Sequence, residues 1–285
     1  MAVVLSWISV LFFREKSRTS QSGVTGMGVA GGHGEVFKQR WSRGPIARTL
    51  LELVYPPMPT LNVISDRELK AIQQGLFGPD KTVLNVGSGG LSGCGKRLWH
   101  SELPKNSKKV IHMDIGEGEL VTLVGDAHNI PLEDNSVDSI IAQALIEHVE
   151  DPIKVVSEFE RVLRPGGKVY VEIPFLQGVH ADPSDFQRYT LDGIKVLLKR
   201  FRCVKAGVSV GPICTLIWVL RDFLSNLFQV RVLNMGVRFL VSWVLAPLRY
   251  LDHLTKNTKA AQRLANEYYF FGELPKDHSN REVAG

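Results

Sequence analysis

The sequence predicts an α/β fold built on a parallel sheet. Short apolar segments alternate with amphipathic ones, and glycine- or proline-rich turns separate them. In residues 152–163 the apolar side chains recur at helical spacing, which predicts a helix, and Arg164-Pro-Gly-Gly167 ends it. Hydrophobic residues make up 44% of the 285 residues, which is enough for a packed core around such a sheet.

The predicted elements follow one another along the chain. Residues 82–86 are a short apolar run that ends in glycines, as a buried parallel strand does. Further strands are predicted at residues 110–113, 121–124, 137–142, 168–173, 203–210 and 268–274. Helices are predicted at 48–53, 66–77 and 191–201, with Thr190 as the N-cap of the last one.

Four parts of the chain differ in composition. We expect residues 1–36 to be a flexible tail or a targeting or anchor segment, since the apolar run 1–13 is too short to span a bilayer. A translation start at Met27 is an open alternative. Residues 37–79 are expected to be a helical N-terminal cap, 80–211 and 263–275 the main domain, and 212–262 an apolar helical insertion.

Charge and cysteine content set loose limits on function. A net charge of +5 permits contact with nucleic acid or an anionic membrane without demanding it. No pair among Cys94, Cys203 and Cys214 has metal-ligand spacing, and an odd number rules out a complete disulfide framework. We therefore expect free thiols in a reducing compartment, and no pattern in the sequence predicts a bound metal.

Four strand ends carry residues suited to an adenosine-containing cofactor. The loop Leu84-Asn-Val-Gly-Ser-Gly-Gly90 follows the first strand, where glycines let the backbone approach a ligand. Asp114 ends the next strand, 25 residues beyond Gly89, and its carboxylate can accept both ribose hydroxyls. Asp126 follows the third strand and can accept a hydrogen bond from an adenine amino group, while Gln143 follows the fourth and can line the pocket floor.

With these motifs, residues 82–191 resemble the class I S-adenosylmethionine-dependent methyltransferase domain of the type 11 kind. Residues 125–138, Ile146-Glu-His-Val-Glu-Asp-Pro152 and Leu163-Arg-Pro-Gly-Gly167 are similar to recurrent phrases of that family. The resemblance implies a Rossmann-like, doubly wound sheet of about seven strands with the last one antiparallel. It also implies S-adenosyl-L-methionine as the cofactor, bound by Asn85, Gly87, Ser88, Gly89, Asp114, Asp126, Ala127 and Gln143.

The sequence departs from the family pattern at two positions. The usual acidic residue of the first motif is Asn85, and the usual last glycine corresponds to Leu91, with Gly90 displaced by one. Asn85 has no charge opposite the sulfonium, so a reduced cofactor affinity is expected. A catalytically weak, methyltransferase-like binding protein is therefore carried as the alternative function.

The acceptor side is expected in a polar and aromatic loop after the fifth strand, running from Phe175 to Thr190. The substrate candidates in it are Phe175, Asp185, Arg188 and Tyr189. His180 and His148 are the catalytic candidates, because an imidazole has a suitable pKa to act as general base for a hydroxyl acceptor. Loop anchoring is the alternative role for His180, and packing beneath the site the alternative for His148.

Residues 212–254 form the most distinctive segment of the chain. The stretch is apolar but is interrupted by charged residues at Arg221, Asp222, Arg231, Arg238 and Arg249. No uncharged run in it reaches the length of a spanning helix, so we expect either a helical pair that caps the domain or a contact with a membrane interface. It follows a parallel strand, whose carboxyl end points to the ligand edge. The insertion is therefore expected to overhang the acceptor site.

These features predict a methyltransferase for a hydrophobic small-molecule or lipid-like acceptor, modified at a hydroxyl or a carbon. We expect a role in small-molecule biosynthesis and a cytoplasmic or organellar location, with a peripheral membrane contact. RNA methylation ranks last, since no nucleic-acid motif or basic cluster supports it, so a nucleic-acid partner is not expected.

Overall fold

The computed structural model describes residues 59–88, 96–99, 104–118, 120–180 and 184–276. The predicted tail 1–36, the predicted helix 48–53, Gly89 and Cys94 lie outside the described residues. The statements below concern the described part of the chain.

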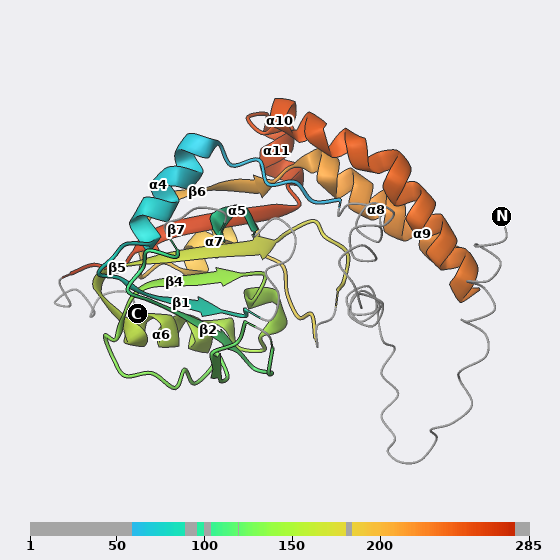
Figure 1. The fold of residues 1–285 in the computed structure, drawn as a ribbon. Coiled ribbons are helices and arrows are strands. Elements are labelled where there is room, and N and C mark those ends of the chain that lie inside the picture. Colours follow the sequence, from blue (N-terminus) through green and yellow to red (C-terminus); the bar gives the residue numbers. More distant parts are fainter. Residues whose placement is uncertain (1–58, 89–95, 100–103, 119, 181–183, 277–285) are drawn as a thin grey trace, which may run out of the picture.

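The core is a sheet of seven strands in the order β3-β2-β1-β4-β5-β7-β6 (Figure 1). The strands are β1 (Thr82–Val86), β2 (Lys109–Asp114), β3 (Leu123–Val124), β4 (Val137–Gln143), β5 (Leu163–Pro174), β6 (Arg202–Val210) and β7 (Glu267–Glu273). Strand β7 runs antiparallel to both of its neighbours, and the pairs on the other side of the sheet are parallel. The predicted doubly wound sheet of seven strands with an antiparallel last strand is confirmed.

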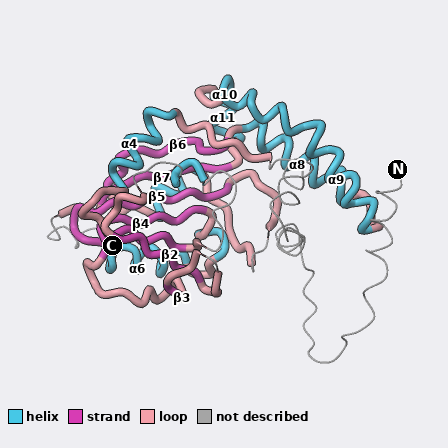
Figure 2. Tube along the Cα trace, in the orientation of Figure 1, coloured by secondary structure: helices cyan, strands magenta, loops and turns pink. Residues whose placement is uncertain are grey.

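Alternating side chains of the central strands supply both faces of the sheet. Val83 and Ile141 lie in one buried cluster, whereas Leu84 and Ile140 lie in another. Helix α4 (Asp66–Leu76) covers the first face, and α6 (Pro152–Val162) and α7 (Leu191–Leu197) cover the second (Figure 2). The central strands are therefore buried on both sides, which explains their continuous apolar sequence.

The helix starts follow local capping chemistry. The Ser65 side chain accepts from the Glu68 N–H, Asp151 accepts from the Lys154 N–H, and Thr190 accepts from the Gly193 N–H. The predicted N-cap role of Thr190 is confirmed. Two shorter elements lie near the carboxyl edge of the sheet, α5 (Lys96–Trp99) and the 3-10 turn η2 (Ile146–His148).

Strands β3 and β5 and helix α7 differ in extent from their predictions, and α7 ends at Leu197 instead of 201. Strand β3 has only two residues, since Val121 forms a turn by donating its N–H to the Gly118 carbonyl. Strand β5 starts at Leu163 instead of 168. Its Gly166 adopts φ +81° and donates its N–H to the Leu274 carbonyl. The glycine turn that ends α6 is therefore also part of the sheet.

The insertion forms a helical hairpin of α8 (Pro212–Asn226) and α9 (Arg231–Leu245), which projects from the domain on the right in Figure 1. Helix α9 runs on through η3 (Ala246–Leu251) and α10 (Asp252–Thr255), and α11 (Lys259–Leu264) leads into β7. The run Arg231–Thr255 has 25 residues and contains an 18-residue window with a mean hydropathy of 1.2, so by length and composition alone it could cross a membrane. From the sequence we excluded only an uncharged run of that length, and Arg238 interrupts this one between Arg231 and Arg249.

The hairpin is polar where its two helices meet. Asn234 donates to Asn226 across 3.2 Å, and the Arg238 guanidinium lies 3.8 Å from the Asp222 carboxylate. Ser242 is the buried residue of α9. On α8 the buried Arg221 pairs with Asp222 at 2.9 Å, and its guanidinium stacks over the Trp218 ring. We call this row of residues the polar seam.

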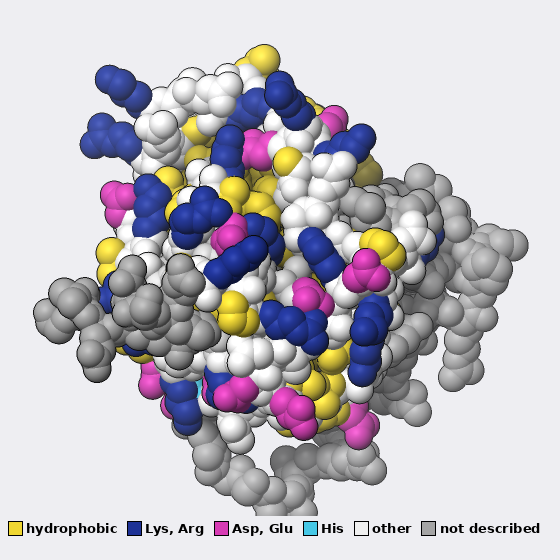
Figure 3. Space-filling model, turned by 90° about the vertical axis from the view of Figure 1, so that its left-hand side faces the viewer, with side chains coloured by type: hydrophobic (Ala, Val, Ile, Leu, Met, Phe, Trp, Pro, Cys, Tyr) yellow, Lys and Arg dark blue, Asp and Glu magenta, His cyan; other side chains and the backbone are white. Residues whose placement is uncertain are grey.

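The outer surface of the hairpin is apolar. Its exposed large side chains are Leu216, Val219, Leu220 and Phe223 on α8, Leu227, Phe228 and Val230 at the tip, and Val232, Leu233, Met235, Phe239, Leu240, Trp243 and Val244 on α9. The face of the molecule seen in Figure 3 has a different character, with basic and acidic side chains spread among smaller hydrophobic areas. An amphipathic helix pair in water has the opposite arrangement, with its apolar stripe inside.

The buried Asp252 fastens the hairpin to the sheet. Its carboxylate accepts from the N–H groups of Ile213 and Cys214 at 2.8 and 2.9 Å, in the first turn of α8. Gly211 leaves room for it, because a Cβ there would lie 2.4 Å from the Asp252 carboxyl carbon. The start of α8 and the end of the long run are therefore held together at the edge of the domain.

We expect Asp252→Ala to lower the free energy of unfolding by about 1–3 kcal/mol, since buried N–H groups would lose their acceptor. Asp252→Asn keeps one accepting oxygen and should cost less. Chemical denaturation followed by circular dichroism measures both changes. Equal stability of Asp252→Ala and the unmodified protein would show that this carboxylate does not hold the hairpin.

Candidate active site

The carboxyl ends of the parallel strands β1, β2, β4 and β5 meet at one edge of the sheet. In Figure 1 this edge faces right, toward the base of the α8–α9 hairpin. The sequence candidates Gly87, Asp114, Gln143 and Phe175 stand directly at these strand ends. Ligands bind at such edges in doubly wound sheets.

The glycine loop begins with a turn that only glycine adopts easily. Gly87 has φ +75°, and a Cβ there would lie 3.1 Å from the Leu145 side chain. The N–H groups of Gly87 and Ser88 both donate to the Met113 carbonyl, at 2.9 and 3.1 Å, and the buried Ser88 hydroxyl donates to it too. Ser88 therefore binds the loop to β2, and Gly87 places no side chain at the turn.

Asn85 lies in a neutral polar cluster beneath this loop. Its amide nitrogen is 3.2 Å from Nδ1 of His112, and burial lowers the pKa of His112, which favours the uncharged imidazole. The Trp99 ring packs against His112, and its indole N–H donates to Gln143. The usual acidic residue of the motif is thus replaced by an uncharged pair.

Both ends of the Gln143 amide have hydrogen-bond partners. Its oxygen accepts from the Trp99 indole, and its nitrogen donates to Glu172 at 2.6 Å. The buried Glu172 also accepts from Asn62 and from the Tyr170 hydroxyl, at 3.2 and 2.7 Å. Gln143 is therefore held in place between Trp99 and Glu172 at the end of β4. Glu172 was not among the predicted residues, since an acidic residue inside a strand gives no signal of its partners.

Two carboxylates stand at the ends of β2 and β3. Asp114 is half-buried, and one of its oxygens accepts from the Gly116 N–H at 3.4 Å. Asp126 accepts from the backbone N–H and the ring of His128, at 2.9 and 2.7 Å, and the backbone bond contributes most to the lowered pKa of Asp126. The next residue, Ala127, is buried in the core. Two carboxylates at strand ends beside the Gly87 turn fit a cationic, ribose-containing ligand.

The loop after β5 is fastened over η2. The Gln187 amide donates to the carbonyls of Ile146 and Val149, and the Tyr189 hydroxyl donates to Gln187. Arg188 pairs with Asp185 and also donates to the Gly178 carbonyl. Phe175 packs on the Tyr268 ring, with centroids 5.5 Å apart. The predicted substrate residues of this loop thus have partners that fix its shape.

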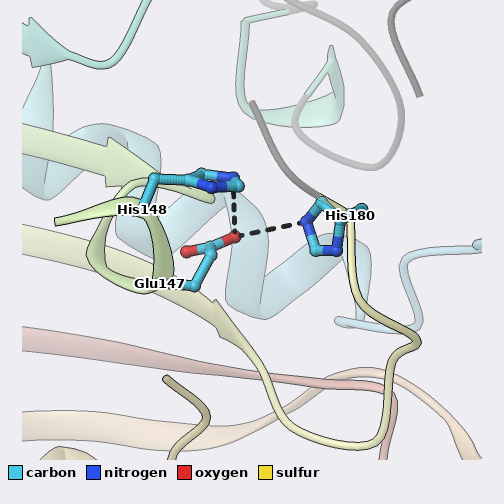
Figure 4. Close-up of side chains that lie close together, drawn as sticks. All are labelled: Glu147, His148 and His180. Carbon is cyan, nitrogen blue, oxygen red and sulfur yellow. Dashed lines mark ion pairs between the residues drawn. The ribbon is translucent and has the colours of Figure 1, made fainter. Parts of the chain in front are cut away.

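Two histidines and a carboxylate meet below this loop (Figure 4). Nε2 of His148 lies 3.7 Å from Oε1 of Glu147, and Nε2 of His180 lies 3.8 Å from the same oxygen. The two imidazole rings stand edge to face, with centroids 5.3 Å apart. Burial acts to lower the pKa of His180, but Glu147, the Gly178 carbonyl and Asp185 outweigh it and raise the pKa overall. The two catalytic candidates, 32 residues apart in sequence, are therefore neighbours.

The base of the hairpin adjoins this cluster. The His180 and Trp218 rings have centroids 6.5 Å apart, which places α8 beside the loop. A Cβ on Gly178 would lie 2.9 Å from an oxygen of Asp222, so the loop backbone touches α8 as well. Neither Trp218 nor Glu147 was predicted, because contacts between the insertion and a distant loop leave no local pattern.

A hollow of about 920 Å³ lies elsewhere, on the side of β6 and α11. Phe175 and Thr190 reach its wall, but no glycine-loop residue does, and neither does Asp114 or Asp126. The strand ends, with their turn and carboxylates, identify the cofactor edge better than this hollow does.

Comparison with known proteins agrees with the geometry. A family model described as a methyltransferase domain matches residues 91–171. An uncharacterized protein of a Streptomyces fradiae transposon is 32% identical over 46% of this chain and 42% of its own length. An uncharacterized methyltransferase of Mycobacterium tuberculosis is 50% identical over 18% of this chain and 21% of its own length. The chain thus spans less than half the length of these two relatives.

Two further proteins are similar to this chain. The ubiquinone biosynthesis O-methyltransferase of Aliivibrio fischeri is 26% identical over 42% of this chain and 54% of that protein. A solved phosphoethanolamine N-methyltransferase of Haemonchus contortus in complex with S-adenosyl-L-methionine covers 74% of this chain and 53% of its own, at 19% identity and a TM-score of 0.45.

The strand order, the glycine turn after β1 and the family match define a class I methyltransferase domain. The chain therefore contains an S-adenosylmethionine-dependent methyltransferase domain of the type 11 kind, and S-adenosylmethionine is the cofactor of that class.

Proposed function

We propose that this protein transfers a methyl group from S-adenosylmethionine to a lipid-like or hydrophobic small molecule at a membrane surface. The observation that carries the proposal is the α8–α9 hairpin, which is polar within, apolar outside and rooted beside the candidate active site. The proposed location is cytoplasmic or organellar, with peripheral membrane attachment through this hairpin.

The distribution of polarity in the hairpin favours lipid over water as its surroundings. Polar groups within hydrocarbon need partners inside the protein, and the polar seam provides them. Apolar side chains in water are unfavourable in a continuous patch, yet they cover the outer faces and the tip. Both features are met if the hairpin enters a membrane.

The dimensions favour insertion into one leaflet. Helices α8 and α9 have 15 residues each, or about 22 Å at 1.5 Å per residue, which is less than the hydrocarbon thickness of about 30 Å. The longer run Arg231–Thr255 includes α10, and Asp252 in that helix is tied to the start of α8 at the domain edge. We therefore infer a hairpin that dips into the bilayer, in preference to a spanning helix.

The position of the hairpin gives a hydrophobic acceptor a path to the site. An acceptor moving along α8 from the tip would arrive at Trp218 and then at His180. In methyl transfer the cofactor supplies the reactive methyl group, while the protein aligns the acceptor and excludes water. Gly87, Asp114 and Asp126 would hold the cofactor, and Phe175, Asp185, Arg188 and Tyr189 would shape the acceptor side. The atom methylated is proposed to be a hydroxyl oxygen or a carbon.

We expect Asp114→Ala to weaken S-adenosylmethionine binding by about 1–3 kcal/mol, or roughly 5- to 150-fold, since the ribose hydroxyls would lose their acceptor. Isothermal titration calorimetry measures the dissociation constant. Asp134→Ala is the matched control, because that carboxylate is exposed and paired with Arg161 away from the edge. Equal affinity of Asp114→Ala and the control would place the ribose elsewhere.

A second function, cofactor binding without turnover, is favoured by one observation. The uncharged Asn85–His112 pair stands where a carboxylate is usual, and it offers no charge to the sulfonium. The two functions differ in product. Purified protein with S-adenosylmethionine and a total cell extract should accumulate S-adenosylhomocysteine if it is an enzyme. No accumulation above the protein-free level, despite binding, would support the second function.

A further inference from the structure

Glu147 is the least satisfied polar side chain at the site. It is fully buried, and neither carboxylate oxygen has a hydrogen-bond partner among the described residues. Burying an ionised carboxylate without partners is costly, so such a group calls for a cation. The Nε2 atoms of His148 and His180 lie 3.7 and 3.8 Å from Oε1 of Glu147.

The backbone fixes which nitrogen of each histidine faces the carboxylate. Nδ1 of His148 lies against the Ser184 carbonyl, and Nδ1 of His180 lies 3.1 Å from the Gly178 carbonyl. A carbonyl only accepts, so a neutral ring that donates to it carries its proton on Nδ1 and its lone pair on Nε2. At His180 the Arg188 guanidinium also lies 3.4 Å from Nδ1, beside the Gly178 carbonyl to which it donates as well. Two lone pairs and a carboxylate thus converge on one point, which repels a further acceptor and attracts a cation.

The supports of these ligands resemble the outer shell of a metal site. Metal-binding imidazoles commonly donate their other N–H to a carbonyl, as both do here. The Asp185 carboxylate accepts a hydrogen bond from the His180 backbone N–H at 2.8 Å. The Phe186 N–H donates to the Glu147 carbonyl at 2.7 Å. The loop and η2 are therefore locked together with the three side chains facing each other (Figure 4).

We propose that Glu147, His148 and His180 bind a divalent first-row transition metal such as Zn²⁺ or Fe²⁺. One potential ligand atom from each residue lies within 4.8 Å of the others. Bonds of about 2.0–2.2 Å to a central ion need only small side-chain movements from these positions. Two imidazoles and one carboxylate suit such metals and leave coordination positions open, whereas Mg²⁺ prefers oxygen ligands.

A second proton on His180 is the competing way to neutralise Glu147. That alternative uses only one histidine, and the 3.8 Å separation exceeds a hydrogen bond. It also leaves the lone pair of His148 beside the carboxylate oxygen at 3.7 Å. A metal ion satisfies all three groups at once, so the geometry favours it.

The metal would also act on the acceptor, a step that rests on the proposed methyl transfer. An acceptor hydroxyl bound at an open position would lose its proton to solvent water more easily. Its oxygen would then form the new bond to the methyl carbon, and the carbon–sulfur bond electrons would remain on S-adenosylhomocysteine. The metal would thus replace the general base expected from the two histidines.

Binding of Co²⁺ tests the site without cofactor or acceptor, so the result does not depend on methyl transfer. Protein treated with a chelator and dialysed is titrated with Co²⁺, whose visible absorption reports its coordination. We expect one saturable site per chain, displaced by Zn²⁺ and not by millimolar Mg²⁺. Absence of a saturable spectrum in the unmodified protein would overturn the proposal.

Variants identify the ligands. Glu147→Gln keeps the shape of the side chain and removes its charge, and we expect at least tenfold weaker Co²⁺ binding. His180→Asn, in the partly exposed loop, should have the same effect and serves if Glu147→Gln does not fold. His253→Asn removes an exposed imidazole on α10 and should bind like the unmodified protein. Unchanged Co²⁺ affinity in a folded Glu147→Gln or His180→Asn variant would contradict the assignment.

Discussion

Gly87→Val is expected to reduce S-adenosylmethionine binding more than 100-fold while leaving the sheet folded. Gly87 has φ +75°, a conformation that is a clear outlier for a β-branched residue. Its new Cβ would also approach Leu145 to 3.1 Å, so the turn would have to move. Because this turn begins the glycine loop at the end of β1, the backbone could no longer approach the cofactor closely.

Calorimetry with S-adenosylmethionine measures this effect, and far-ultraviolet circular dichroism reports whether the sheet is retained. Gly236→Ala is a suitable control, since that glycine lies in α9 and a Cβ there meets nothing within 4 Å. The control should bind the cofactor normally. A folded Gly87→Val variant with the affinity of the control would remove the glycine turn from the cofactor site.

Replacing the apolar tip of the hairpin should abolish membrane attachment. Leu227 and Phe228 are 58% and 39% exposed at the turn between α8 and α9. Burial of each such side chain in lipid contributes about 1.5–3 kcal/mol, and a carboxylate in its place opposes insertion. We therefore expect the double change Leu227→Glu and Phe228→Glu to lower vesicle partitioning by at least two orders of magnitude.

Flotation with vesicles of phosphatidylcholine and phosphatidylglycerol measures the partitioning. The matched control places two glutamates at Ile153 and Val196, which are 70% and 68% exposed on α6 and α7. It adds the same charge and removes as much exposed apolar surface, away from the hairpin, so it should float like the unmodified protein. If the unmodified protein stays in solution, or if the tip variant floats with it, the membrane proposal is wrong.

Local patterns were enough to predict most strands and helices of the domain, while the seven-stranded sheet with an antiparallel last strand followed from the family resemblance. The apolar run 82–86 and the glycines after it identify β1 and its turn, and the spacing within 152–163 identifies α6. The N-cap at Thr190 followed from its side chain and the helix behind it. Each of these depends on residues close together in sequence, which is why periodicity and turn chemistry captured them.

The acceptor side and the hairpin depend on contacts that the sequence does not contain. In the sequence, Glu147 is only one residue of a family motif. Its proximity to His180 arises from the fold of the loop after β5 and cannot be predicted from the motif. Likewise, Arg238 and Asp222 meet only because α8 and α9 pair with their polar sides together. The periodicity of the sequence predicted helices with an apolar face. It did not predict whether that face would lie between α8 and α9 or on the outside of the pair.

In the proposed function, the methyl group of S-adenosylmethionine leaves this edge of the sheet for a membrane-soluble acceptor. The most direct test supplies the protein with tritiated-methyl S-adenosylmethionine and vesicles carrying a membrane lipid extract, and then separates organic from aqueous products. We expect tritium in the organic phase, an equal amount of S-adenosylhomocysteine, and no transfer by Gly87→Val. Tritium confined to the aqueous phase, or no more in the organic phase than Gly87→Val yields, would contradict the proposed function.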